Sequence, residues 1–168
     1  MGLTIFWCIF VRDPCVKIGK AKPRDVPEIK KLIDAYSVDG RTVPRSLSHL
    51  YTNVREFFVC REAGKVIGCG ALHVSWDDLA EIRSVAVHAS RKGNGIGTAL
   101  VKACLREARQ LGVPQVFALT AAPGFFEKLG FRRIPKSSLP MKVFGECLNC
   151  IKYPECSEEA VIRKVRRT

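Results

Sequence analysis

Three glycines alternate along one short segment of the chain, between Lys92 and Thr98. A strand-like run precedes this segment and a helix-like run follows it. Glycines leave no side chain where a backbone turns, so exposed amides can point at a shared anion, and the following helix adds its positive dipole end. The segment therefore predicts a turn that binds a pyrophosphate without a metal. The candidate anion-binding residues are Lys92, Gly93, Asn94, Gly95, Ile96, Gly97 and Thr98.

Two familiar phosphate-binding motifs do not fit this segment. A Walker A loop needs Lys and then Ser or Thr after its last glycine, whereas Gly97 is followed by Thr98 and Ala99. The dinucleotide fingerprint spaces its glycines as G-x-G-x-x-G, whereas the spacing here is G-x-G-x-G. A glycine-rich strand-to-helix turn without a ligand stays the alternative interpretation.

The strand-like run before the turn, residues 79–87, carries two charged residues among apolar ones. Regular alternation would place Glu81 and Arg83 on one face, together with Val85. Charges in an apolar strand are costly unless they face a cleft or pair with each other. Glu81 and Arg83 are therefore predicted to face a cleft, and a surface Glu81–Arg83 pair stays the alternative.

The elements that must position these residues follow from the hydrophobic pattern. Strands are expected at residues 16–21, 57–61, 66–75, 79–87, 116–120 and 131–134. Helices are expected at residues 25–36, with Asp25 as the cap, and at 47–54, 95–111 and 123–129. Meander strands come first and crossover helices later, so the order predicts a mixed sheet with helices on both faces.

The glycine turn resembles a motif of the GCN5-related N-acetyltransferase (GNAT) family, Arg/Gln-x-x-Gly-x-Gly/Ala, with Lys92 replacing Arg or Gln. Residues 125–131 resemble the family's F-[YF]-x-x-x-GF segment, and the resemblance covers residues 16–134. It implies the GNAT fold, an α/β (α+β) fold whose mixed central sheet is mostly antiparallel and has helices on both faces. It also implies acetyl-CoA as the cosubstrate of an acyltransferase.

The resemblance further implies that a free amine attacks the thioester carbonyl directly, in a ternary complex. Glu81 is then the candidate catalytic base, acting through water. Phe126 stands where the family often has a tyrosine acid, and residues 121–131 contain no tyrosine. Besides the turn residues above, the implied cofactor contacts are Val85, Ala86, Val87 and Phe126.

Several segments resemble the short amino-acid N-acetyltransferases of the N-acetylglutamate synthase type, namely residues 43–46, 66–73, 80–87 and 117–120. This resemblance implies L-glutamate as the acceptor, in the first step of arginine biosynthesis. Each carboxylate of glutamate needs a cation or several donors, which makes Arg45, Ser46, Arg83 and Ser84 the candidate substrate contacts. A protein or peptide N-acetyltransferase and a non-catalytic acetyl-CoA-binding module stay the alternatives.

The C-terminal cysteines Cys147, Cys150 and Cys156 follow a C-x2-C-x5-C pattern. The first pair has the spacing of a zinc knuckle, but no histidine follows to complete a local ligand set. Structural zinc, a disulfide or redox role, and unligated thiols all stay open. The three histidines are too scattered to suggest a site and are expected to be structural; they are His49, His73 and His88.

Composition and charge limit the classes of binding partner and the number of domains that we expect. The 168-residue chain carries a formal net charge of +12, which suits a phosphorylated cofactor, a carboxylate-rich substrate or nucleic acid. We expect a single domain over residues 16–168, after an N-terminal extension of residues 1–15. The basic run at residues 163–167 is expected to be a solvated end.

The apolar run at residues 3–11 is too short to span a membrane, which takes about 20 residues. It also lacks the basic start and the cleavage site of a signal peptide, so an additional strand or an extension outside the domain is expected. We therefore expect a cytoplasmic protein with no membrane or nucleic-acid partner, and the family resemblance makes a homodimer one expectation.

Overall fold

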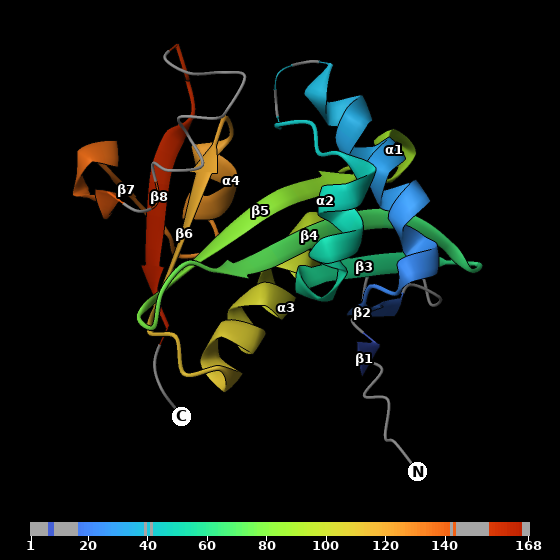
Figure 1. The fold of residues 1–168 in the computed structure, drawn as a ribbon, viewed down its shortest axis with the longest axis horizontal. Coiled ribbons are helices and arrows are strands. Elements are labelled where there is room, and N and C mark those ends of the chain that lie inside the picture. The colour runs from blue at the N-terminus through green and yellow to red at the C-terminus, as the bar shows by residue number, and fades with distance from the viewer. Residues whose placement is uncertain are drawn as a thin grey trace.

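A computed structural model describes residues 7–8, 17–38, 40, 42–141, 143 and 155–165. Within these residues, eight strands form one sheet in the order β1-β2-β3-β4-β5-β6-β8-β7 (Figure 1). The strands are β1 Trp7–Cys8, β2 Lys17–Lys20, β3 Phe57–Glu62, β4 Lys65–Val74, β5 Leu79–Val87, β6 Gln115–Thr120, β7 Arg132–Ile134 and β8 Glu159–Lys164. The helices are α1 Val26–Ser37, α2 Leu47–Thr52, α3 Ile96–Gln110 and α4 Pro123–Glu127. Neighbouring strands are antiparallel except for β5 and β6, which confirms the predicted mixed and mostly antiparallel sheet.

Helices cover both faces of this sheet, as predicted. Ile29 of α1 and Leu50 of α2 pack in one buried cluster with Ala71 of β4. Val101 of α3 and Phe126 of α4 belong to a different cluster, on the opposite face. Helix α3 forms because its apolar residues recur every three or four positions, and this spacing gives one continuous buried side.

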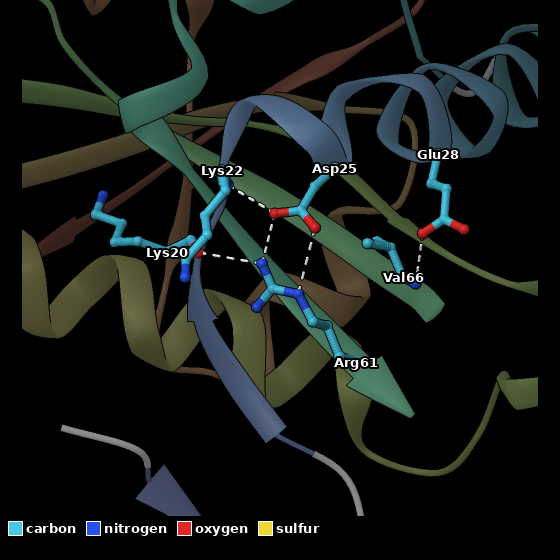
Figure 2. Close-up of polar contacts among 6 residues, drawn as sticks. All are labelled: Lys20, Lys22, Asp25, Glu28, Arg61 and Val66. Atoms are coloured by element: carbon cyan, nitrogen blue, oxygen red, sulfur yellow. Dashed lines mark hydrogen bonds and ion pairs between the residues drawn. The ribbon is translucent and has the colours of Figure 1, made fainter. Parts of the chain in front are cut away.

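Asp25 precedes α1 as predicted, but its carboxylate does not cap the helix. It accepts instead from the Lys22 backbone N–H at 2.6 Å and pairs with the Arg61 guanidinium at 2.5 Å (Figure 2). Arg61 also donates to the Lys20 carbonyl at 3.3 Å. This nearly buried ion pair therefore joins the start of α1 to both β2 and β3.

The C-terminal strand β8 lies between β6 and β7, so Arg163 and Lys164 belong to an internal strand and not to a free end, although the Lys164 side chain is exposed as expected. Ala160 and Val161 are buried, because apolar residues here occupy the two faces of a central strand. The Arg163 guanidinium donates to the Leu129 carbonyl, and the Val165 N–H donates to the Pro114 carbonyl at 2.7 Å. The basic side chains therefore accompany an internal strand.

Strand β1 pairs with β2, with Trp7 opposite Ile18 and Cys8 opposite Lys17. This pairing favours the additional strand over an extension outside the domain, and the division at residue 15 stays a prediction. Among the described residues, no helix is both long enough and apolar enough to cross a membrane.

Candidate functional site

The parallel strands β5 and β6 separate after a short paired stretch, and a cleft opens between them. They pair only from Leu79 to Glu81 of β5, opposite residues 115–117 of β6. We call the point where this pairing ends, at Glu81, the vertex. Beyond the vertex lies the cleft, which has a volume of about 1040 Å³. Its walls also include the end of α1, the loop before α2, the glycine turn, the start of α3, and α4. Figure 1 shows β5 and β6 meeting at one end and diverging toward the other.

The predicted glycine turn forms one end of this cleft. Gly93 and Gly95 have φ values of +81° and +78°, a region that residues with a Cβ rarely adopt. Gly97 has an ordinary helical backbone, but a Cβ there would lie 3.4 Å from the Phe125 ring. The first amides of α3 have no partner within the helix and are therefore available to an anion. Of the seven predicted anion-binding residues, only Asn94 does not line the cleft.

Cations gather beside this turn, and sequence reasoning missed two of them. Arg91 lines the cleft and donates to Glu62 at 2.5 and 3.1 Å. The Lys92 ammonium lies 4.9 Å from the centre of the Tyr36 ring, and the Tyr36 hydroxyl donates to the Val87 carbonyl at 3.0 Å. Lys128 lines the same cavity from the end of α4, in the segment that carries the second family-like motif.

Strand β5 contains a bulge in the middle of the cleft wall. The flanking pairs are Cys69 with Ala86 and Ala71 with Arg83. Ser84 and Val85 therefore face the single residue Gly70 of β4. Ser84 has a φ of +55°, which is uncommon for a residue other than glycine. A bulge leaves its extra residue outside the regular ladder, so backbone groups at this point can face the cleft.

The bulge reverses the side-chain alternation, so the prediction that Arg83 and Val85 share a face is wrong. Paired residues of antiparallel strands share a face, which puts Arg83 with Ala71 on the side of α1. Val85 packs on the opposite side, against the α3 cluster that contains Ile82. Ala86 is 1% exposed and does not line the cleft, whereas Ser84, Val85 and Val87 do.

The Arg83 guanidinium lies in the cleft wall and is nearly buried, with 6% of its side chain exposed. It donates to Glu56 at 3.1 Å, and the other oxygen of Glu56 lies 2.8 Å from Nδ1 of His73. Burial alone would raise the pKa of the Glu56 carboxyl. The hydrogen bond from His73 and the charges of His73 and Arg83 outweigh burial and hold that pKa below its ordinary value. Glu56 is therefore an ionised partner of Arg83.

Glu81 lies at the vertex of the cleft, where β5 and β6 stop pairing. It is half-buried, lines the cavity, and stands opposite Phe117 of β6 and His73 of β4. Arg83 of the same strand forms an ion pair with Glu56, and a Glu81–Arg83 pair stays the alternative for the charge of Glu81. A carboxylate such as Glu81, at the closed end of a partly apolar cleft, is well placed to accept a proton.

The two other predicted substrate contacts lie at the start of α2. Arg45 is half-buried, lines the cleft, and makes no hydrogen bond or ion pair among the described residues. Ser46 does not line the cleft, because its hydroxyl caps α2 by accepting from the His49 N–H at 3.1 Å. His49 itself lines the cleft, although it was expected to be structural.

Phe126 lines the cleft and is 5% exposed. Its ring meets Phe125 and Phe131 edge to face, at centroid distances of 5.1 and 5.2 Å. The side chain at this position therefore contributes packing and no proton.

The four cysteines whose side chains the structure describes divide into three buried thiols and one that lines the cleft. Burial raises the pKa of Cys60, Cys69 and Cys104 to about 12. Cys156 lines the cleft, with its Sγ 4.0 Å from a carboxylate oxygen of Glu158. Cys147 and Cys150 lie outside the described residues, and the described part of the chain holds no cluster of three metal-binding side chains. A zinc site stays a prediction.

Taken together, the cleft has a glycine turn with the first amides of α3 at one end, a carboxylate at its vertex, and on its wall an arginine without a partner among the described residues. The family model described as "Acetyltransferase (GNAT) family" matches residues 27–131. The chain belongs to the GNAT family of acetyltransferases. It is an N-acetyltransferase, and acetyl-CoA is its cosubstrate.

Two GNAT relatives match most of the chain. An uncharacterized N-acetyltransferase from Chlorobaculum tepidum is 36% identical over 90% of this chain and 96% of its own length. An amino-acid acetyltransferase from Mycobacterium tuberculosis is 43% identical over 80% of this chain and 79% of its own length. A third relative, the amino-acid acetyltransferase of Neisseria meningitidis, is 30% identical, but the match spans only 30% of that longer protein.

Solved GNAT structures resemble this one closely. A Mycobacterium tuberculosis protein in complex with CoA and NLQ has a TM-score of 0.79 at 36% identity, over 89% of this chain and 99% of that chain. N-acetylglutamate synthase from Neisseria gonorrhoeae, complexed with coenzyme A and N-acetyl-glutamate, has a TM-score of 0.84 at 25% identity. The match covers 92% of this chain and 36% of that one. Both comparisons confirm the predicted GNAT fold.

The residues of the cleft fit acetyl-CoA as this family's cosubstrate. The turn offers backbone amides in a conformation that glycine permits, and Lys92, Arg91 and Lys128 line the same cleft. The bulge at Ser84 interrupts the strand between the turn and the vertex. The cleft therefore offers cations that suit the phosphates of a long thioester and, at the vertex of β5 and β6, a carboxylate.

Proposed function

We propose that the chain transfers the acetyl group of acetyl-CoA to the α-amino group of a free amino acid, most favourably L-glutamate. This reaction is the first step of arginine biosynthesis. The observation that carries the proposal is the Arg45 guanidinium, which lines the cleft with no partner among the described residues. An unpaired arginine on the wall of a cleft is well suited to bind a carboxylate through two parallel hydrogen bonds.

Acetyl-CoA lies along β5 in this proposal. Amides of the glycine turn and the start of α3 bind its pyrophosphate, and Lys92 and Lys128 supply positive charge to its phosphates. Backbone groups around Val85, beside the Ser84 bulge, hold its carbonyl oxygen. When bound, it supplies an acyl group that is activated toward an amine.

Glu81 takes the proton of the attacking amine, through one water molecule. Its place at the vertex puts the carboxylate beside the point where β5 leaves β6. No tyrosine lies in residues 121–131, so we assign protonation of the leaving thiolate to solvent. This assignment departs from the tyrosine acid that the wider family often uses.

Arg45 and Arg83 bind the carboxylates of the acceptor, and Ser84 is an additional donor. Ser46 contributes by capping α2, which fixes the position of the neighbouring Arg45. The relatives support a small acidic acceptor, because several are amino-acid acetyltransferases and one neighbouring structure holds N-acetyl-glutamate. A homodimer and a cytoplasmic location accompany this proposal as predictions.

A steady-state acceptor assay tests the proposal. Release of free CoA is followed with glutamate, glutamine, aspartate, and short peptides with free N-termini. We expect kcat/KM to be highest for glutamate. Glutamine has an amide in place of the second carboxylate, and the side chain of aspartate is one methylene group shorter. Turnover of peptides alone would indicate a peptide N-acetyltransferase instead. Acetyl-CoA binding without turnover of any acceptor would indicate a non-catalytic module.

A further inference from the structure

The carboxylate that binds Arg83 comes from outside the cleft. Glu56 lies in a short 3-10 turn, Val54–Glu56, between α2 and β3. It does not line the cleft and borders instead a separate depression of about 230 Å³. Glu56 therefore contacts a cleft residue without reaching the substrate.

Both oxygens of Glu56 are engaged by side chains of the sheet. One accepts from the Arg83 guanidinium at 3.1 Å, and the other lies 2.8 Å from Nδ1 of His73. Arg83 and His73 come from adjacent strands, β5 and β4, and share one face of the sheet with Glu81, which is the register partner of His73. A buried guanidinium needs such a partner, because an uncompensated buried charge is strongly unfavourable.

The segment that carries Glu56 also carries the other arginine of the acceptor site. Arg45 lies immediately before Ser46, the cap of α2, and Glu56 follows the C-terminus of the same helix. Residues 45–56 therefore begin with Arg45 and end with Glu56, which forms the ion pair with Arg83. The two guanidinium groups have different electrostatic states: Arg83 is matched by Glu56, whereas Arg45 has no counter-charge among the described residues.

We propose that Glu56 is a positioning residue for the acceptor: it orients Arg83 so that the remaining N–H donors face the amino-acid carboxylate. This inference rests on the proposed function, in which Arg83 binds that carboxylate. Arg45 supplies the net positive charge for the acceptor, and Arg83 supplies directed hydrogen bonds. Loss of Glu56 removes this ion pair and so weakens the constraint on the orientation of the Arg83 guanidinium.

The test is a double-mutant cycle on full-length protein with the best acceptor. Glu56→Ala should raise the acceptor KM by about tenfold and change the acetyl-CoA KM by less than about twofold. Glu56→Gln keeps the length and one acceptor oxygen, so its acceptor KM should fall between those of the wild type and Glu56→Ala. In an Arg83→Ala background, Glu56→Ala should change the acceptor KM by less than about twofold, because the two residues act as one unit.

Asp34→Asn is the matched control. It removes the charge of a carboxylate that pairs with Lys30 at 2.7 Å on the surface of α1, away from the cleft. We expect both KM values to stay at the wild-type level. Thermal unfolding of every variant separates loss of fold from loss of positioning, and Glu56→Gln carries the test if Glu56→Ala does not fold.

The outcomes separate this inference from the proposed function. If Arg83→Ala leaves the acceptor KM unchanged, the proposed acceptor site is wrong and the role of Glu56 is wrong with it. If Arg83→Ala raises the acceptor KM but neither Glu56 variant does, only the positioning role of Glu56 is overturned. That role is also overturned if Glu56→Ala raises the acceptor KM by an equal factor with and without Arg83.

Discussion

At the scale of single residues, the proposed acceptor site contains two arginines in different states. Arg45 is half-buried and has no partner among the described residues, whereas Arg83 is nearly buried and paired with Glu56. The sequence indicated both positions through their types and the family resemblance. It did not indicate Glu56, because 27 positions separate this residue from Arg83 and only the folded sheet brings the two together.

Replacing Arg45 should weaken acceptor binding selectively. In Arg45→Ala we expect the glutamate KM to rise by about tenfold or more, with the acetyl-CoA KM almost unchanged, because the proposed site assigns the guanidinium a charge-assisted contact with the acceptor alone. Initial rates over a matrix of both substrate concentrations give the two constants. An equal rise in both would show that Arg45 does not bind the acceptor.

Replacing the vertex carboxylate should affect turnover rather than binding. Glu81→Gln keeps the size of the side chain but cannot accept a proton, so kcat should fall by about a hundredfold or more. Both KM values should stay within about threefold of the wild type. If kcat is unchanged in Glu81→Gln when acetyl transfer limits the rate, Glu81 is not the base.

At the scale of elements, local patterns predicted much of the fold. The glycine turn, α1, α3 and the β3–β4 hairpin follow from residues close together in the chain. The bulge at Ser84 and the insertion of β8 between β6 and β7 were missed, because both depend on pairing with distant strands. The alternation of β5 was therefore predicted correctly only up to Arg83.

The two glycines at the start of α3 should respond differently to alanine. Gly95→Ala should lower the free energy of unfolding by about 1–2 kcal/mol, since φ at this position is +78°. Gly97→Ala should leave that free energy nearly unchanged, because the backbone is helical there. Its Cβ would meet the Phe125 ring at 3.4 Å beside the cleft, so the acetyl-CoA KM should rise.

Chemical denaturation and acetyl-CoA titration measure these two effects separately. A large loss of stability in Gly97→Ala, or none in Gly95→Ala, would contradict the assigned backbone conformations.

At the scale of the whole molecule, the cleft exists because β5 and β6 diverge while the rest of the sheet stays paired. Three buried thiols lie elsewhere in the core, each in a different cluster, on β3, β4 and α3. Burial raises the pKa of Cys60, Cys69 and Cys104 from the ordinary 9.0 to about 12. The unfolded chain therefore releases these protons at a lower pH than the native protein does.

The buried thiols should make the protein less stable in alkali. Their contribution to the free energy of unfolding is fully present below pH 9 and should be lost as the pH rises from 9 toward 12. Thermal unfolding between about pH 8 and 11 measures this loss, with Cys69→Ala and Cys104→Ala as comparison variants. The fall should be shallower in each variant, since one buried thiol no longer contributes to it. An identical fall in the wild type and both variants would assign the alkaline instability to other groups.

The identity of the acceptor is tested most directly by a competition experiment. The protein is incubated with acetyl-CoA and an equimolar mixture of the free L-amino acids together with peptides that carry free N-termini and lysines. Mass spectrometry then identifies every acetylated product. We predict N-acetyl-glutamate as the dominant early product, with acetylation at the α-amino group. Acetylated peptides without any acetylated free amino acid would contradict the proposed function.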